Sequence, residues 1–302
     1  MQNLHELPKL RDSLSYLYVE HAILDKKSQA VEFIQEYGRT LIPVANLSVL
    51  MLGPGTSITH AAIKTLAENG CSVLWTGEDA TRFYAQGMGE TRKARRLIRQ
   101  AELVCDANLR QQIVIRMYRH RFAEDLPEDL TLPQIRGMEG VRVRQAYATA
   151  SKEYGVPWKG RRYDRGSWRN ADPVNRALSA ANALLNGLCH AAIVSGGYLP
   201  GLGFIHTGKQ LSFVYDIADL YKVETTIPTA FAIVSESTAK VESRVRSACR
   251  QKFRDIKLIQ RILPDIDSLF DLTTQEQPEI DGIDDIDVDP ALPTRLWKPL
   301  EE

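Results

Sequence analysis

The amino-acid sequence predicts an α+β protein in which a small β-rich, β-sandwich-like domain over residues 1–88 is followed by a larger all-α domain over residues 89–264. Two observations support this division. Short apolar, β-branched and aromatic runs dominate the chain up to residue 85, whereas apolar residues recur with helical periodicity after about residue 90. An acidic, proline-containing segment over residues 265–302 departs from both patterns, and we expect it to form a tail that is flexible or docked on a partner.

The strands of the first domain are separated by turn-forming stretches, and one helix interrupts them. The strand-like segments are LSYLYVEHAIL, AVEFIQ, RTLIPVANLSVLML, CSVLW and TRFYAQ. In the interrupting segment THAAIKTLAENG, Thr59 can cap the first turn, and Gly70 stands where a left-handed C-terminal cap is expected.

The second domain follows an expected linker near residues 86–91 and begins with two basic amphipathic helices, ETRKARRLIRQAELV and ANLRQQIVIRMYRHRF. A third helix over LPQIRGMEGVRVRQAYATASKEYG is expected to end near Gly155. After the loop VPWKGRRYDRGSW, Asp172 and Pro173 supply a cap and a first-turn proline for a further helix.

The composition is typical of a folded soluble protein, with 44% hydrophobic and 25% charged residues. The chain contains neither a run of about eighteen apolar residues nor a signal peptide, which predicts a cytoplasmic location. The spacing of the cysteines suits neither zinc nor a disulfide framework, so we expect them to be reduced and mostly buried. They are Cys71, Cys105, Cys189 and Cys249.

The formal net charge of zero hides an asymmetry between the body and the tail. Residues 265–302 contain twelve Asp or Glu against two basic residues, Arg295 and Lys298, which leaves −10 there and +10 on residues 1–264. A basic body predicts a polyanionic partner. Composition leaves open whether the tail is disordered or docks on another protein.

A histidine and two aspartates share the short segment HTGKQLSFVYDIADLYK. Asp216 and Asp219 are three residues apart, so a helix places both carboxylates on one face, where they repel unless a cation, a proton or an arginine lies between them. With His206 they form a set that suits a divalent cation with open positions, and the oxygen-rich ligands favour Mg²⁺ or Mn²⁺. A purely structural alternative makes Asp216 a helix cap and Asp219 a surface charge.

Glu139 lies between two glycines, Gly137 and Gly140, inside the third helix. Each glycine costs about 1 kcal/mol relative to alanine in a helix interior, and tight packing or the close approach of another backbone would explain both. By pattern alone the sequence favours a helix–helix contact with a solvent-facing glutamate.

Basic and aromatic residues surround these acids in the sequence. Each arginine taken singly suits a solvated helix face, but the cluster suits phosphate binding with base or sugar stacking. Its members are Arg136, Arg142, Arg144, Arg161, Arg162, Tyr163, Arg165, Trp168, Lys209 and Lys222. An acidic metal site in a basic body indicates phosphodiester chemistry on nucleic acid. No GxxxxGK[ST] loop is present to support nucleotide triphosphate hydrolysis.

Four segments carry a resemblance to a known family: GPGTSITHAA, QIRGMEGVRVRQAYA, YGVPWKGRRYD and GFIHTGKQLSFVYDIADLYK. Over residues 10–255 the chain resembles the CRISPR-associated integrase/endonuclease of the spacer-acquisition complex, in the branch that accompanies subtype I-E interference systems. The resemblance implies an asymmetric homodimer, formed through the β-domain, with one divalent metal per helical domain. It implies Glu139, His206 and Asp219 as metal ligands and Asp216 as a further acid of the site.

The resemblance also implies a reaction and an assembly. Two dimers flank a dimer of a small ferredoxin-like subunit, and the 3′-hydroxyl of a protospacer attacks a phosphodiester at a CRISPR repeat boundary by direct transesterification. Family members also cleave branched or single-stranded DNA. Two other functions remain open from the residues alone: a branched-DNA nuclease acting in repair without a partner, and a DNA-binding assembly subunit whose carboxylates only fold the helical domain.

Individual DNA contacts are also implied by the resemblance. Tyr163 and Lys209 match positions that read one end of the protospacer, and Arg82 and Arg136 match basic positions near the bound strands. The chain departs from the family at His21, where related members place a tyrosine that caps the DNA duplex. Because imidazole stacks less extensively than a phenol, the capping geometry is expected to differ.

Overall fold

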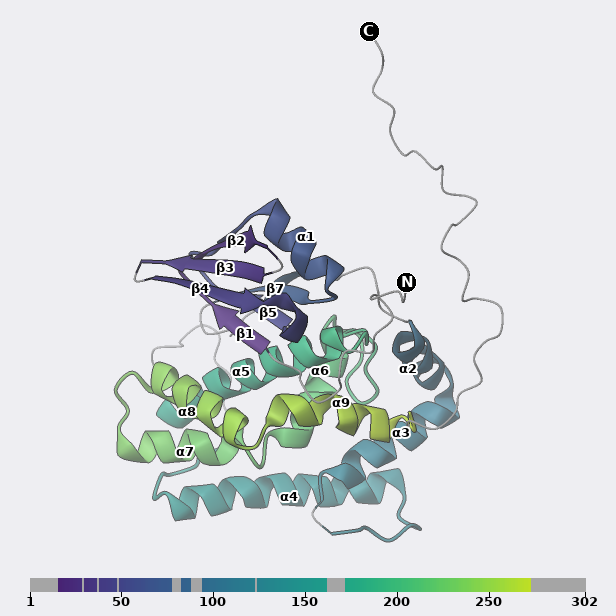
Figure 1. Ribbon diagram of the computed structural model, residues 1–302. Helices are drawn as coiled ribbons and strands as arrows, with labels where there is room; N and C mark the ends of the chain where they lie inside the picture. The colour runs from purple at the N-terminus through teal and green to yellow at the C-terminus, as the bar shows by residue number, and fades with distance from the viewer. Residues whose placement is uncertain are drawn as a thin grey trace, which may run out of the picture. The chain divides into compact units, whose positions relative to one another are not determined.

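Two four-stranded sheets form the N-terminal part of the computed structural model, and helices form the rest (Figure 1). The structure describes residues 16–28, 30–36, 38–47, 49–77, 83–87, 94–122, 124–161 and 172–272. The described residues up to Asp271 belong to one compact unit. The tail beyond residue 272 lies outside the described residues. So do several predicted DNA contacts, namely Arg82, Arg162, Tyr163, Arg165 and Trp168.

The first sheet has the strand order β1-β5-β7-β8, and the second has the order β4-β3-β2-β6. The pairs β1–β5 and β5–β7 are parallel and β7–β8 is antiparallel; in the second sheet β2–β3 and β3–β4 are antiparallel and β2–β6 is parallel. The strands are β1 Tyr16–Val19, β2 Ile23–Lys27, β3 Ala30–Gln35, β4 Gly38–Pro43, β5 Val49–Leu52, β6 Ser57–Ile58, β7 Ser72–Thr76 and β8 Phe83–Gly87. A short 3₁₀ helix, η1 Val44–Asn46, follows β4.

The core of the β-rich part joins both sheets to helix α1, His60–Glu68. It contains Leu24 from β2, Leu50 from β5 and Leu66 from α1, all fully buried. Burying each such side chain contributes about 1.5–3 kcal/mol. Both cap predictions for α1 are confirmed: the Thr59 hydroxyl accepts from the amide of Ala62, and Gly70 has φ +62°.

The helical part is built around one long apolar helix, α5, which contacts α6, α7, α8 and α9. Its helices are α2 Arg95–Cys105, α3 Ala107–His120, α4 Leu132–Glu153, α5 Pro173–Ser195, α6 Ser212–Tyr221, α7 Thr226–Glu236, α8 Val241–Asp255 and α9 Leu258–Leu269. Helix α5 is long and apolar enough to cross a membrane, but 72% of that span is buried inside the protein. It is therefore the central core helix.

Most of the predicted helix boundaries hold. Helix α4 is followed by Gly155 in the left-handed region, at φ +64°, and Pro173 opens α5. Asp172 is the N-cap residue, but its side chain accepts from the amide group of the Asn175 side chain rather than from the helix backbone. The predicted linker overlaps β8, which continues to Gly87.

The cysteine prediction is also confirmed, since Cys71, Cys189 and Cys249 are buried, Cys105 is exposed, and all four are free thiols. His21 is exposed at φ +51° in the turn between β1 and β2.

The start of the expected acidic tail belongs to the helical part. Helix α9 runs to Leu269, beyond the predicted end of the helical domain at residue 264. Asp265 accepts from the Tyr221 hydroxyl at 2.7 Å, and Asp267 forms a bidentate pair with Arg96 at 2.6 and 3.0 Å. These carboxylates are structural anchors, because their partners come from helices far away in the sequence.

Candidate metal centre and active site

The loop that carries His206 connects α5 to α6 and wraps around one buried carboxylate, that of Asp216. Asp216 Oδ2 accepts the backbone amides of Phe204 at 2.6 Å and Ile205 at 3.1 Å, and Oδ1 accepts the amide of His206 at 2.9 Å. Three backbone donors satisfy a charge that is fully buried, which is why the loop can turn back on α6. Asp216 is therefore not the helix cap that the structural alternative made it.

The same carboxylate orients the histidine ring. His206 Nδ1 lies 2.7 Å from Asp216 Oδ1 and donates to it, which leaves Nε2 for another partner. This hydrogen bond raises the pKa of His206, and the charges of Asp216 and Asp219 act in the same direction. The family resemblance implies a catalytic part for Asp216 as a further acid of the site, but its contacts here are those of a residue that positions the loop and the His206 ring.

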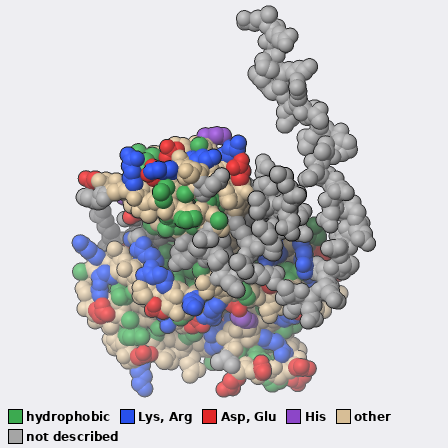
Figure 2. Space-filling view, in the orientation of Figure 1, with side chains coloured by type: hydrophobic (Ala, Val, Ile, Leu, Met, Phe, Trp, Pro, Cys, Tyr) green, Lys and Arg blue, Asp and Glu red, His purple; other side chains and the backbone are tan. Residues whose placement is uncertain are grey.

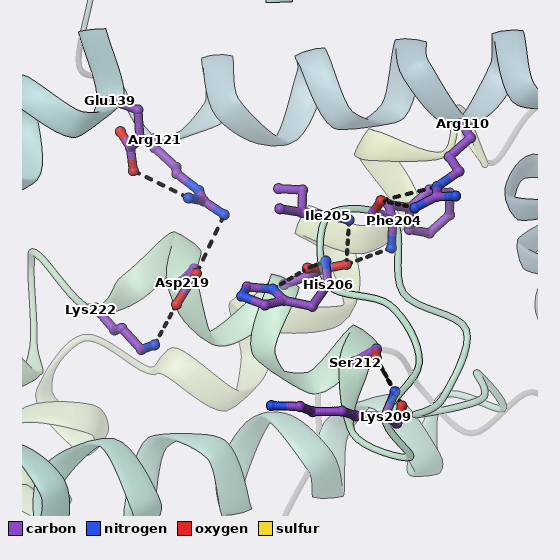
Figure 3. A network of polar contacts seen from close by, with 11 residues as sticks. Arg110, Arg121, Glu139, Phe204, Ile205, His206, Lys209, Ser212, Asp219 and Lys222 are labelled. Carbon is purple, nitrogen blue, oxygen red and sulfur yellow. Dashed lines mark hydrogen bonds and ion pairs between the residues drawn. The ribbon is translucent and has the colours of Figure 1, made fainter. Parts of the chain in front are cut away.

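Basic and amide side chains from α2 and α3 hold the rest of the loop. Arg110 donates to the Phe204 carbonyl through Nε at 3.1 Å and Nη2 at 2.8 Å (Figure 3). The fully buried Gln100 donates to the carbonyls of Leu199 and Leu202. Gly203 is required for a steric reason, because a Cβ atom there would lie 2.3 Å from the His206 carbonyl oxygen.

Glu139 is buried, with 7% of its surface exposed, so the prediction of a solvent-facing glutamate was wrong. Its Oε2 accepts from Arg142 Nε at 2.7 Å, and its Oε1 accepts from both Arg142 Nη2 at 3.1 Å and Arg121 Nη1 at 3.2 Å. Periodicity could not reveal this, because Arg121 comes from the end of α3 and α4 is otherwise largely exposed. The two arginines compensate the buried charge.

The glycines beside Glu139 have a different surrounding from the one expected. Apart from its chain neighbours and the nearby backbone of α4 itself, no atom of the described residues lies within 4 Å of a Cβ placed on Gly137, and only the end of the Arg144 side chain approaches one on Gly140. Tight packing against another backbone therefore does not account for them. Both glycines leave the surface of α4 open beside Glu139.

Asp219 lies on α6 and shares Arg121 with Glu139. Its Oδ2 is 3.9 Å from Arg121 Nη2, and its Oδ1 pairs with the ammonium group of Lys222. In Figure 3 the guanidinium of Arg121 stands between the two carboxylates, and the His206 ring points to the side where Asp219 lies. The structure thus brings Glu139 and Asp219 within reach of one positive group.

The side chains of Glu139, His206 and Asp219 are of the types that bind a divalent cation, although the two carboxylates here face Arg121. Glu139, His206 and Asp219 do not form a three-ligand cluster, and no other three His, Cys, Asp or Glu side chains do so among the residues that the structure describes. Two carboxylates nevertheless converge on a single positive charge whose Nε and Nη2 make no hydrogen bond with the described residues. With one imidazole nitrogen uncommitted, this donor set suits Mg²⁺ or Mn²⁺.

The predicted DNA-binding residues separate into two groups. Arg136 and Lys209 are exposed, whereas Arg142 and Lys222 pair with Glu139 and Asp219. Arg161 donates to the Asn175 side chain at 3.2 Å and to the Ser179 hydroxyl at 3.0 Å, which ties the end of its loop to α5. Figure 2 shows further Lys and Arg side chains scattered over one face of the protein.

Comparison with known proteins identifies the family to which this fold and site belong. The family model described as CRISPR associated protein Cas1 matches residues 15–124 and 118–250. The chain belongs to the Cas1 family. A "CRISPR-associated endonuclease Cas1 2" of Thermus thermophilus is 56% identical over 299 residues, which cover 98% of this chain and 90% of that protein.

Solved Cas1 structures confirm the α+β fold. A crystal structure described as a TtCas1–DNA complex superposes with a TM-score of 0.78 at 59% identity, covering 87% of this chain and 99% of that one. A chain of a partial Cas6-RT-Cas1–Cas2 complex superposes with a TM-score of 0.59 at 16% identity, covering 85% and 94%. The second likeness shows a shared fold alone.

Sequence reasoning missed the residues that organise this Cas1 site from a distance. Arg121, Arg110 and Gln100 lie in helices that were recognised only as basic and amphipathic. The one available signal was Gln100, a polar residue in an otherwise apolar position of α2, where it is buried.

Proposed function

We propose that this protein is a metal-dependent DNA integrase and endonuclease of CRISPR adaptation. It joins the 3′-hydroxyl ends of protospacer DNA to repeat boundaries of a CRISPR array by direct transesterification. Membership of the Cas1 family supports the class of reaction. The observation that carries the proposal is the convergence of Glu139 and Asp219 on one positive charge, beside a histidine oriented by a buried carboxylate.

Each residue of the site has a defined part in this proposal. Glu139, His206 and Asp219 would hold Mg²⁺ or Mn²⁺, which supplies charge stabilisation at the phosphate and activates the attacking hydroxyl. Asp216 keeps the His206 ring in one orientation. Arg142 pairs with both oxygens of Glu139, and Lys222 pairs with Asp219. The exposed Arg136 and Lys209 are suited to contact the DNA backbone.

The assembly belongs to the same proposal. We assign the protein to the subtype I-E branch, as a cytoplasmic homodimer of which two copies bind a dimer of the small adaptation subunit. The substrates are protospacer duplexes with single-stranded 3′ ends and CRISPR repeat DNA. A relative of 59% identity has been solved as a DNA complex, and a chain of the same fold comes from a complex containing Cas2.

Asp219→Ala tests the proposed reaction. The protein, with its small partner, is incubated with a 3′-ended duplex and a supercoiled repeat plasmid, with Mg²⁺ or Mn²⁺ and separately with a chelator. We expect strand transfer to fall at least about 100-fold, because ligand loss costs more than loss of a residue behind a ligand. The helical circular dichroism and the DNA affinity should be retained. Asp255→Ala, at the exposed end of α8, is the matched control.

Three results would contradict the proposal in different ways. Full strand transfer by Asp219→Ala, or in chelator, removes the metal-dependent reaction. Loss of folding by Asp219→Ala indicates an assembly subunit whose carboxylates only stabilise the domain. Efficient cutting of branched DNA without any joining indicates a repair nuclease.

A further inference from the structure

Arg121 is the least expected cation of the site. It caps the C-terminal end of α3, its side chain is only 6% exposed, and it lies between candidate ligands contributed by α4 and α6 (Figure 3). Among the described residues, Arg142 pairs with Glu139 and Lys222 with Asp219, whereas Arg121 faces both carboxylates.

The contacts of Arg121 are poor for a buried guanidinium. Nη1 donates to Glu139 at 3.2 Å, but Nη2 is 3.9 Å from Asp219, too far for a hydrogen bond. Nε and Nη2 are buried without a hydrogen-bond partner among the described residues. The guanidinium carbon also lies 5.0 Å from the ring centre of Tyr118. Buried donors without partners carry a desolvation cost, so this arrangement needs a compensating reason.

This inference rests on the proposed function. We propose that Arg121 is an internal counter-cation, whose guanidinium takes the place of the metal ion between Glu139 and Asp219. Without the cation it pairs with Glu139 Oε1, which also accepts from Arg142 Nη2 at 3.1 Å, and faces Asp219 Oδ2, so that it offsets the repulsion between the two carboxylates. Arg121 gives way when a divalent cation binds, so it stabilises the metal-free site and lowers metal affinity. Arg121 is bonded to the end of α3 through its backbone N–H, so its side chain can rotate without breaking that helix.

The test is Mn²⁺ binding to the full chain without DNA, measured by isothermal titration calorimetry. We expect Arg121→Gln to bind Mn²⁺ on the order of tenfold more tightly than the wild type, since the competing charge is gone. Arg99→Gln is the matched control, because it breaks an arginine–glutamate pair of 3.3 Å at the surface and should leave the affinity unchanged. An unchanged or weaker affinity in Arg121→Gln overturns the proposal, as does Mn²⁺ binding by neither protein.

Thermal unfolding provides a second measurement that does not depend on activity. Without metal, Arg121→Gln should have a lower Tm than the wild type, and saturating Mn²⁺ should raise its Tm by more. Arg121→Lys is the second variant, for the case in which the glutamine variant does not fold. It keeps a positive charge, but its ammonium group cannot span both carboxylates, so the lysine variant should bind Mn²⁺ with intermediate affinity. If Arg121→Gln does not fold and Arg121→Lys binds Mn²⁺ with the wild-type affinity, the proposal is overturned.

The counter-cation role and the proposed function fail separately. Absence of strand transfer with a tightened Mn²⁺ affinity in Arg121→Gln refutes the proposed reaction and supports the counter-cation. Strand transfer with an unchanged Mn²⁺ affinity in Arg121→Gln does the reverse.

Discussion

The two sides of the candidate site are held in different ways. On the histidine side, Asp216 receives three backbone amides and the His206 ring, and Arg110 and Gln100 hold the loop from outside. On the carboxylate side, Glu139 and Asp219 are held by arginine and lysine side chains. Backbone hydrogen bonds fix the position of the His206 loop, whereas the positive groups that pair with Glu139 and Asp219 can be replaced by another cation.

This difference indicates which side is pre-formed. A ring oriented by a buried carboxylate loses little freedom when it binds a ligand, so the histidine side is ready before any cation arrives. The carboxylate side is satisfied by the protein's own positive charges, so the proposed metal binding would require it to exchange at least one of them. Removing the central acid of the histidine side should therefore cause the larger loss of stability, whereas changing a charge on the carboxylate side should mainly change ligand affinity.

The largest effect is expected from Asp216→Ala. The change leaves three backbone amides and the His206 ring without their acceptor in a buried position, and it should lower the free energy of unfolding by about 3–5 kcal/mol. Denaturant unfolding checks this value. Asp216→Asn keeps one acceptor oxygen and should lose less. If Asp219→Ala destabilises the protein as much as Asp216→Ala does, the contrast between the two sides is lost.

A smaller effect is expected from Gly203→Ala in the histidine loop. The added Cβ would lie 2.3 Å from the His206 carbonyl oxygen and 2.7 Å from Ser212 Cβ, so the loop must move. Such overpacking should lower stability by about 1–3 kcal/mol. Denaturant unfolding measures the loss, and the imidazole proton resonances of His206 report the displacement. If stability and the His206 resonances are unchanged, the loop can accommodate the added methyl group more easily than its hydrogen bonds indicate.

Gly137→Ala, on the helix that carries Glu139, should raise the stability of the protein rather than lower it. Apart from its chain neighbours and the nearby backbone of α4, no described atom lies within 4 Å of the new Cβ. Because alanine is favoured over glycine in a helix interior, stability should rise by about 0.5–1 kcal/mol. An increase in the denaturant midpoint with an unchanged slope is the expected result. A decrease would show that the glycine serves the metal-free fold after all.

Much of the fold was predictable from local patterns. The change of period near residue 90 separated the sheets from the helices, and the caps at Thr59 and Gly70 follow from side-chain chemistry and backbone conformation within one helix turn. The end of the helical part was predicted too early. In the sequence, Asp265 and Asp267 look like the first charges of an acidic tail, but distant residues, Tyr221 and Arg96, bind them.

The type of most elements, the positive charge of residues 1–264, and the set of acids and imidazole that suits a hard cation depend on residue chemistry and short spacings, so they can be read from the chain directly. What those side chains contact depends on how the helices and loops pack. Asp216 became the anchor of the histidine loop, Glu139 was buried, and Arg121 came to lie between Glu139 and Asp219. The reason is physical: burial and charge pairing depend on which distant segments meet, and the periodicity of one helix carries no information about its partners.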